Sequence, residues 1–282
     1  MQTKYEQKDT VLHVENLSIA YGEKVIISNI NFTEKDIVRP DKTQGQTIAF
    51  VGRSGRGKST LFRALTGLED PTTGMVLIPD YEKGIVNGQQ PAKKVKEGDV
   101  GFVDQKYTLF RHKTIYQSLK YAYRKANLSA AEKEEKINQY LHDWGLNNAK
   151  NQYPNELSGG QRQRTAILEQ LLSSGFYMVL DEPFSGLDIG NIQNVKDAFK
   201  LINESHELNT IIFSTHDIEL AVELADSLYV LGYSKNNDNS LSQTGTILKN
   251  FDLKQMGLAW QNEIRAEHLD LVKEIKEIML AS

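Results

Sequence analysis

The chain has 282 residues, 39% of them hydrophobic and 25% charged, so it is long enough for one large domain or two small ones with a buried core. Its formal net charge of -4 gives no overall basic field that would hold a polyanion; a local basic patch is not excluded, but we expect no nucleic-acid partner. The absence of cysteine excludes disulfides, thiolate-bound iron–sulfur clusters, thiol nucleophiles and cysteine-based zinc sites.

No segment of the sequence is typical of a signal peptide or a membrane span. Met1–Asp9 is polar and mixed in charge, without the apolar stretch that a secretory signal needs. The best apolar run, Phe176–Leu180, is far shorter than a membrane-spanning helix. We therefore expect any membrane role to come through a partner.

The N-terminal part predicts strands around one strand–loop–helix unit. Short β-branched and apolar runs between Val11 and Phe32 indicate strands joined by turns, which predict an antiparallel edge. Asp36–Gln46 is polar and is predicted to be a loop, whereas Thr47–Val51 suits a strand buried on both faces. Lys58–Leu68 has apolar residues at helical spacing and predicts a helix.

The middle of the chain predicts further strands and then a helical subdomain. Gly74–Gly101 holds short apolar pieces among Gly, Lys and Gln, which favours strands and a connection without chemistry. Thr114–Asn151 is typical of helices, with a solvated charged face at Ala130–Lys136. The expected apolar stripe is formed by Ile115, Leu119, Tyr123, Ile137, Leu141 and Trp144.

The C-terminal part alternates helix and strand, which predicts a mainly parallel sheet. In chain order we expect a helix at Gln161–Leu172, a strand at Phe176–Leu180, a helix at Ile192–Asn203, a strand at Thr210–Ser214, a helix at Ile218–Leu224 and a strand at Ser227–Leu231. Gly232–Ser242 is rich in Asn and Ser and predicts a surface loop. Ala259–Met279 predicts a helix, packed on the body or on a partner, with one apolar face of Trp260, Ile264, Leu271, Ile275 and Ile278.

A glycine-rich run separates the buried strand from the first helix. Gly52–Ser59 matches G-x-x-x-x-G-K-[ST], in which backbone N–H groups surround phosphates, Lys58 reaches the β- and γ-phosphates and Ser59 binds Mg²⁺. The N-terminus of the following helix adds a favourable dipole for an anion. An incidental Gly/Ser turn is the alternative, and the flanking strand and helix argue against it. The predicted nucleotide-binding residues are Gly52, Arg53, Ser54, Gly55, Arg56, Gly57, Lys58, Ser59 and Thr60.

Two acids follow the second buried strand. Asp181 directly follows Phe176–Leu180, where a carboxylate at a strand tip can hold Mg²⁺ through its water shell. Glu182 comes next and is predicted to orient or deprotonate the attacking water. Adjacent acids alone are typical of a solvated turn, so the phosphate-binding run decides in favour of catalysis.

Leu157–Gln161 reads Leu-Ser-Gly-Gly-Gln and resembles the signature sequence of the ABC ATPases. Together with the glycine run, it identifies the chain as a member of this superfamily. The resemblance extends from Leu12 to Leu231 and implies that the chain binds ATP and Mg²⁺. It also implies that Tyr21 stacks on adenine, that Gln105 contacts Mg²⁺ and the attacking water, and that His216 contacts the γ-phosphate. Asp188, in Ser185-Gly186-Leu187-Asp188, is expected in the loop that links two active sites.

Taken singly, these residues have other interpretations. Tyr21 alone is more typical of packing than of base stacking, and Gln105 alone is typical of a surface amide. His216 beside Asp217 fits a helix cap or a lone metal ligand, although no second His lies nearby in the sequence and the chain has no Cys. Their order along the chain and the two motifs favour the nucleotide site.

The resemblance implies an α/β fold: a P-loop NTPase (RecA-like) core with an antiparallel β edge and an inserted α-helical subdomain. We expect a single ABC ATPase domain over residues 1–231, with a catalytic core at 1–104 and 162–231 and the helical subdomain at 105–161. Residues 232–282 are expected to form a loop and a C-terminal helical extension.

The signature also implies a dimer. In this family Ser158, Gly159, Gly160 and Gln161 serve the γ-phosphate bound to the opposite subunit. The chain has one glycine run, one signature and one strand-tip Glu, so it supplies one half of each of two composite sites. We therefore expect a head-to-tail dimer with itself or a paralogue, closed by ATP.

The lack of membrane spans, the single cassette and the short helical insertion leave a stand-alone subunit of an ABC transporter as the expected function. The chain resembles import ATPases, especially those of the nitrate, sulfonate and taurine group. This resemblance implies integral-membrane permease partners and a place on the inner face of the cell membrane. Leu168-Glu169-Gln170 departs from the usual Ala-Arg-Ala, which weakens the substrate grouping. The alternative is a soluble ABC-type ATPase that drives assembly or remodelling of a cytosolic complex.

Overall fold

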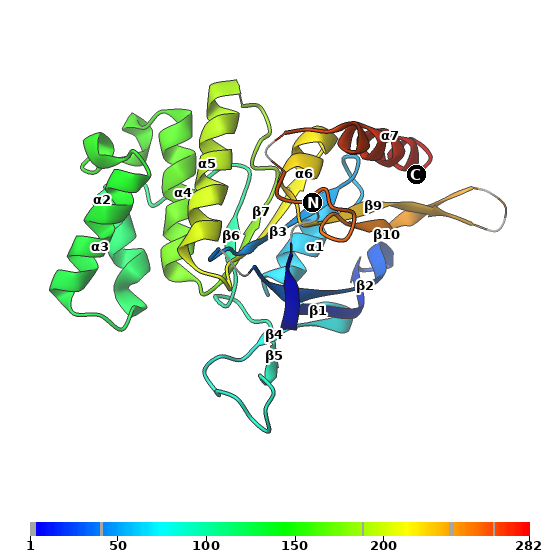
Figure 1. Ribbon diagram of the computed structural model, residues 1–282, viewed down its shortest axis with the longest axis horizontal. Helices are drawn as coiled ribbons and strands as arrows, with labels where there is room; N and C mark the ends of the chain where they lie inside the picture. Colours follow the sequence, from blue (N-terminus) through cyan, green and yellow to red (C-terminus); the bar gives the residue numbers. More distant parts are fainter. Residues whose placement is uncertain (1–3, 40–41, 188, 237, 239, 262) are drawn as a thin grey trace.

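The computed structural model describes residues 4–39, 42–187, 189–236, 238, 240–261 and 263–282. Its centre is a ten-stranded mixed sheet in the order β5-β4-β1-β2-β10-β9-β3-β8-β7-β6 (Figure 1). The strands are β1 Glu6–Tyr21, β2 Lys24–Val38, β3 Gln46–Val51, β4 Thr73–Pro79, β5 Ala92–Lys94, β6 Gly101–Val103, β7 Tyr177–Leu180, β8 Thr210–Thr215, β9 Ser227–Lys235 and β10 Leu241–Asp252. The α-helices are α1 Lys58–Leu65, α2 Ile115–Ala122, α3 Ala130–Asp143, α4 Gly159–Ser173, α5 Ile189–Ser205, α6 Ile218–Leu224 and α7 Ala266–Leu280, and short 3-10 turns lie at Tyr123–Lys125, Asn147–Ala149 and Pro154–Glu156.

Strand β3 is buried on both faces and divides two hydrophobic cores. All six of its residues are buried, between β8 and β9, which both run parallel to it. Ala49 and Val51 belong to the core that contains residues of helices α2 to α7. Ile48 and Phe50 belong to the second core, under α1 and the antiparallel strands. Successive side chains of a strand alternate between faces, so one short apolar strand supports both layers.

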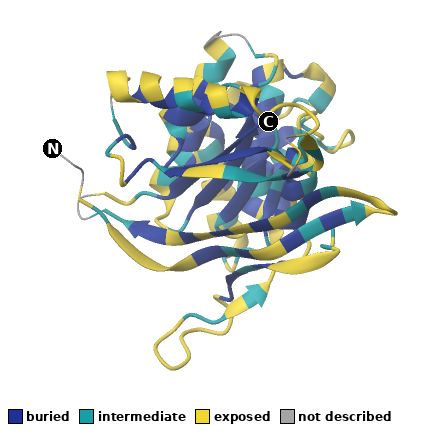
Figure 2. Cartoon of the chain, turned by 90° about the vertical axis from the view of Figure 1, so that its right-hand side faces the viewer, coloured by how far each residue is buried: buried dark blue, intermediate teal, exposed yellow. Residues whose placement is uncertain are grey.

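The antiparallel edge is confirmed and is longer than the sequence indicates. β1 pairs with β2 along nearly its whole length and with β4 on its other side. Burial alternates along β2, because one face lies on the core and the other faces solvent (Figure 2). A single parallel pair, Gly245 with Ile27, joins this arm to the rest of the sheet.

Helices α2 and α3 form a lobe beside α4, away from the sheet (Figure 1). Both begin with a capping box, at Thr114 and at Ser129, which satisfies N–H groups that have no partner in the first turn. Most of the predicted apolar stripe is buried here, and Tyr123 packs against it while only partly buried. The stripe joins the core of α4, so the lobe is fixed to the signature helix.

Three expectations about irregular segments were wrong in extent. β2 continues to Val38, so the loop expected at Asp36–Gln46 is shorter. β9 and β10 run well into Gly232–Ser242 and form a long hairpin. α7 begins only at Ala266, so Trp260 and Ile264 precede it, and α7 packs on α6 and β9 of the same chain.

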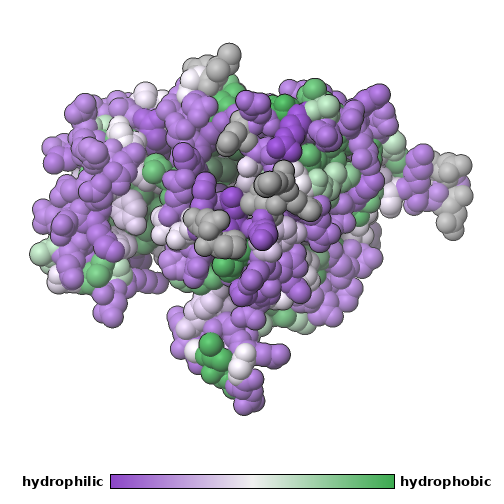
Figure 3. All heavy atoms as spheres, in the orientation of Figure 1, coloured by the Kyte–Doolittle hydropathy of each residue, from purple (hydrophilic) through white to green (hydrophobic). Residues whose placement is uncertain are grey.

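The connection between β4 and β5 projects below the sheet (Figure 1). Ile85 and Val86, in this connection, are 74% and 52% exposed, and Val86 forms an isolated bridge with Gln89. Apolar side chains are therefore exposed on this projection, where Figure 3 shows green among purple. Among the described residues, no helix has the length and apolarity to cross a bilayer.

Candidate functional site

The glycine-rich run forms the loop between β3 and α1, as its sequence predicts. Gly55 and Gly57 have φ of +78° and +91°, a conformation that side chains rarely adopt. A Cβ at Gly57 would lie 2.3 Å from the Ile27 side chain, and one at Gly52 would lie 2.5 Å from the Leu231 carbonyl oxygen. The loop can therefore curl this tightly only with glycine at these positions.

This loop borders a cavity of about 510 Å³ at the carboxyl ends of the parallel strands. That edge is where ligands bind in open α/β sheets, because loops after several strands converge there. The cavity is lined by Ile26, Ser54, Gly55, Gly57, Lys58, Ser59, Thr60, Gln105, Asp181, Glu182, Ser185 and His216. Most of these residues are predicted nucleotide, catalytic or Mg²⁺ residues, and they meet in one place although they are distant in sequence.

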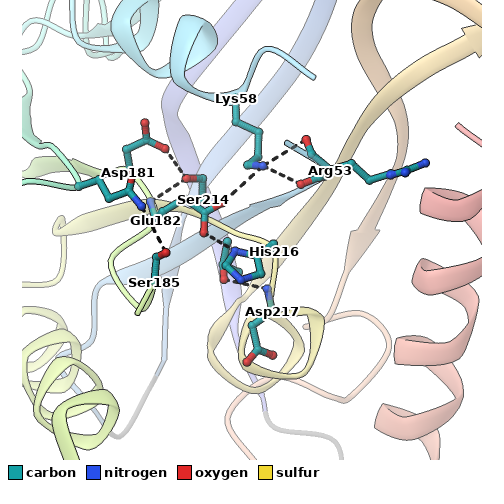
Figure 4. Close-up of polar contacts among 11 residues, drawn as sticks. Arg53, Lys58, Asp181, Glu182, Ser185, Ser214, His216 and Asp217 are labelled. Carbon is teal, nitrogen blue, oxygen red and sulfur yellow. Dashed lines mark hydrogen bonds and ion pairs between the residues drawn. The ribbon is translucent and has the colours of Figure 1, made fainter. Parts of the chain in front are cut away.

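Lys58 opens α1 and points its ammonium group to the centre of the site (Figure 4). Its Nζ donates to the carbonyl oxygen of Gly52 at 2.6 Å and lies 3.4 Å from that of Arg53. A carboxylate oxygen of Glu182 is also 3.4 Å away. The Lys58 side chain is only 8% exposed, so its charge acts with little screening by solvent.

Glu182 and His216 contact each other across the cavity. Glu182 has φ of +51°, an unusual conformation for a residue with a side chain, which turns its carboxylate from the end of β7 into the cavity. Its Oε2 lies 2.8 Å from Nδ1 of His216, the residue that directly follows β8. One carboxylate thus touches both Lys58 and His216, so the three side chains form a single charged cluster (Figure 4).

Ser214 contacts both acids, although it belongs to no motif of the sequence. Its hydroxyl donates to Asp181 Oδ1 at 2.6 Å and accepts the backbone N–H of Glu182 at 2.9 Å. Leu180 pairs with Phe213 in the parallel ladder, which places the next residues, Asp181 and Ser214, side by side. Only this register reveals the serine.

Gln105 and Ser185 complete the wall opposite the phosphate loop. Gln105 follows β6, and its Nε2 donates to the Ser185 hydroxyl at 3.2 Å. Both residues line the cavity with Asp181. Asp217, beside His216, caps α6 by accepting the N–H of Leu220 at 3.1 Å, so the helix-cap role belongs to the aspartate.

The signature residues lie elsewhere. Ser158 is the N-cap of α4, and its capping box with Gln161 aligns the first turn of that helix. Ser158 and Gly159 are exposed, whereas Gly160 is buried, and a Cβ there would lie 2.7 Å from Asn191 Oδ1. None of these residues lines the cavity described above. The first turn of α4 is instead exposed at Ser158 and Gly159.

Two further predicted residues are less tied to the cavity. Tyr21, at the end of β1, is 49% exposed and does not line the cavity. Its hydroxyl contacts Thr60, which is one of the lining residues. Partial burial and the Glu69 carboxylate raise the pKa of Tyr21. Asp188 lies outside the described residues. Arg53 and Arg56 belong to the loop, but their side chains do not line the cavity.

Sequence comparisons identify relatives of known type. The family described as ABC transporter matches residues 36–185. The sulfate/thiosulfate import ATP-binding protein CysA of Synechocystis is 33% identical over 234 residues, 83% of this chain and 60% of that protein. The arginine transport ATP-binding protein ArtM of Bacillus subtilis is 36% identical over 219 residues, 77% of this chain and 85% of that protein. The chain thus spans well under two thirds of the first relative and most of the second.

Solved structures with the same fold include cbiO1 from Clostridium perfringens, part of the ABC transporter complex cbiONQ, with a TM-score of 0.67 at 23% identity, covering 96% of this chain and 99% of that one. A dimeric bacterial ABC transporter cassette has a TM-score of 0.61 at 24% identity, covering 86% and 98%. They establish the expected α/β P-loop fold. The family match and the two relatives show that the chain belongs to the ABC transporter family.

Proposed function

We propose that the chain hydrolyses ATP as a head-to-tail dimer and thereby energises a membrane transporter. The observation that carries the proposal is that the catalytic residues and the signature residues lie in different places. Lys58, Glu182 and His216 meet in one cavity, whereas Ser158 and Gly159 lie exposed at the N-terminus of α4, outside it. A second copy, arranged head to tail, supplies its signature to the cavity of the first copy, and the signature of the first copy completes the cavity of the second.

In this proposal each cavity residue has one task. The phosphate loop and Lys58 hold the β- and γ-phosphates, and Tyr21 carries the adenine. The Glu182 carboxylate accepts a proton as a water oxygen attacks the γ-phosphorus, and the bond to the bridging oxygen breaks to give ADP and phosphate. His216, 2.8 Å from Glu182, keeps that carboxylate aimed at the water and contacts the γ-phosphate.

The residues present fit Mg²⁺ held jointly with the nucleotide. Ser59, Gln105 and Asp181 line the cavity together, and all offer oxygen ligands. Among the described residues no group of three or more His, Cys, Asp or Glu could hold a metal by itself. Mg²⁺ commonly takes one or two carboxylates, waters and substrate phosphates, and when bound it neutralises charge on the phosphates.

Asp188 is assigned to the link between the two sites.

Replacing Glu182 by Gln tests the composite site. We expect Glu182→Gln to bind ATP and to persist as an ATP-bound dimer, because the carboxylate that accepts the proton is lost while the binding groups stay. Light scattering measures the mass with and without ATP. As the control, Glu182→Gln combined with Gly159→Asp should stay monomeric, since Gly159 has open space for a side chain and the added charge opposes phosphate. A monomeric Glu182→Gln with bound ATP would contradict the proposal.

The transport role implies integral-membrane permease subunits and a place at the inner face of the cell membrane. The relatives named for sulfate/thiosulfate import and for arginine transport match at similar identity, so this chain does not specify the solute. The nitrate, sulfonate and taurine grouping stays a prediction. Copurification in detergent with an integral-membrane protein tests the role, and stimulation of ATPase activity by a soluble scaffold alone would instead favour assembly or remodelling of a cytosolic complex.

A further inference from the structure

The phosphate loop is held from outside by the C-terminal part of the chain. The contacts come from the β9–β10 hairpin and from Ser282, two residues after the end of α7. We call Tyr233, Gly245 and Ser282 the brace, because all three touch the loop or its Arg56 side chain. None of the three lines the nucleotide cavity.

Arg56 connects the loop to the brace. It lies between Gly55 and Gly57, both of which line the cavity, whereas its own side chain points away. The guanidinium carbon lies 3.9 Å from the centre of the Tyr233 ring, and Nη2 donates to the Ser282 carbonyl oxygen at 3.1 Å. Arginine suits this position because its planar group stacks and donates at the same time, which lysine cannot do.

The brace also holds the main chain of the loop. The Tyr233 hydroxyl donates to the Gly55 carbonyl oxygen at 3.2 Å. Gly245, paired with Tyr233 in the sheet, passes so close that a Cβ there would lie 2.2 Å from the Arg56 carbonyl oxygen. The C=O and N–H groups of one peptide point in opposite directions, so an outward Arg56 carbonyl turns the Gly57 N–H toward the cavity.

The same segment reaches the opposite side of the site. Ser282 is 3% exposed and sits on Gly232, where a Cβ would lie 2.7 Å from its hydroxyl oxygen. α7 packs on α6, the helix that follows His216, and Lys276 pairs with Glu219 of its first turn at 3.2 Å. Figure 1 shows α7 lying along α6 and the hairpin. The segment from α7 to Ser282 thus contacts both Arg56 of the loop and α6, the helix behind His216.

We propose that Tyr233 and Arg56 are positioning residues that preset the phosphate loop for nucleotide. Such presetting lowers the cost of ordering the loop on binding, so it affects affinity. Once ATP is bound, the phosphates themselves hold the loop. Removing the brace should therefore weaken nucleotide binding and leave turnover at saturating ATP nearly unchanged.

Graded variants of Tyr233 test this proposal. Tyr233→Phe removes only the hydrogen bond to Gly55, and we expect the ADP dissociation constant to rise by about two- to threefold. Tyr233→Leu also removes the stack, and the rise should be roughly tenfold. Arg56→Lys, which keeps the charge, should weaken ADP binding as well. Calorimetry with ADP and Mg²⁺ measures affinity, and steady-state ATPase assays give KM and kcat.

Tyr121→Leu is the matched control. Arg124 stacks on the Tyr121 ring at the same distance, 3.9 Å, but in the α2–α3 lobe, so ADP affinity should not change. A structural role of Tyr233 would lower kcat through inactive protein, whereas the positioning role raises KM. Wild-type ADP affinity in Tyr233→Leu, or a fall in its kcat as large as its loss of affinity, would overturn the proposal.

Discussion

Single residues of the site were predictable where phosphate chemistry fixes their type and spacing. Lys58, Asp181 and Glu182 stand in motifs, and they meet in the cavity. Ser214 was not predictable, because a serine at the end of a strand is common and its contact with Asp181 depends on the pairing of β7 with β8. Glu169 was noticed only as a departure from the family pattern, and its burial needs the packing of α4 on α2.

Glu169 should make stability depend on pH. It is 6% exposed, and this burial raises the pKa of its carboxyl from 4.5 to about 7, while a hydrogen bond with Ser118 opposes the rise. The folded state therefore binds the proton more tightly than the unfolded state. The resulting stabilisation is complete below pH 4.5 and is lost as the pH rises through about 7.

Replacing the carboxyl by an amide isolates this effect. Glu169→Gln keeps the shape of the side chain and removes the titrating group. The free energy of unfolding of the variant minus that of the wild type should therefore rise by about 2 to 3 kcal/mol between pH 5 and pH 8. Urea unfolding at several pH values measures the difference. Glu204→Gln, on the exposed side of α5, is the control and should give a flat difference. A flat difference for Glu169→Gln too would contradict the prediction.

At the scale of elements, periodicity predicted the parallel strands and most helices, because burial on one or both faces leaves a pattern in the sequence. It failed at the β9–β10 hairpin. Gly232–Ser242 is polar because this part of the hairpin projects from the body, and a polar strand carries the composition of a loop. The start of α7 was placed too early because Trp260 and Ile264 happen to fit its apolar spacing.

Tyr107 joins three elements and gives a prediction at this scale. It follows β6, its hydroxyl donates to the Pro183 carbonyl oxygen at 3.0 Å, and Gln163 of α4 donates to both oxygens at 2.6 Å. Desolvation raises the pKa of Tyr107 to about 12, so its hydroxyl stays a donor at neutral pH. Tyr107→Phe should lower the free energy of unfolding by about 1 to 2 kcal/mol, since partly buried groups lose a partner.

Urea unfolding at neutral pH measures this loss. Tyr140→Phe removes the same hydroxyl from a partly buried tyrosine of α3 and should cost less than about 0.5 kcal/mol. Equal losses in the two variants would mean that the hydrogen bonds of Tyr107 do not stabilise the junction of β6, α4 and the loop after β7.

At the scale of the molecule, the fold has the parts of two half-sites. The phosphate loop and Glu182 serve the chain's own cavity, whereas α4 presents Ser158 and Gly159 to solvent. The sequence could predict the parts of each half, since both are short motifs. Their separation in space follows from the α2–α3 lobe, which joins α4 and stands apart from the phosphate loop. In the proposed dimer, this separation means that each complete site needs residues from two copies.

Mixing two inactive variants tests that necessity directly. Lys58→Ala disables the phosphate loop and Gly159→Asp the signature, so each alone should have almost no ATPase activity. In a heterodimer, the intact loop of one chain meets the intact signature of the other, while the second site carries both defects. Each mixed dimer has one working site of two, so an equal mixture should recover activity, up to about half of that of the wild type at equal total protein.

The control uses two defects on the same half-site. Lys58→Ala mixed with Glu182→Gln leaves a damaged cavity in every chain, and no pairing can rebuild a working site, so the mixture should stay inactive. ATPase assays at equal total protein compare the two mixtures. Recovery in the first and none in the second requires that loop and signature come from different chains; no recovery in either would mean that each chain must work within itself or that both sites must be intact at once.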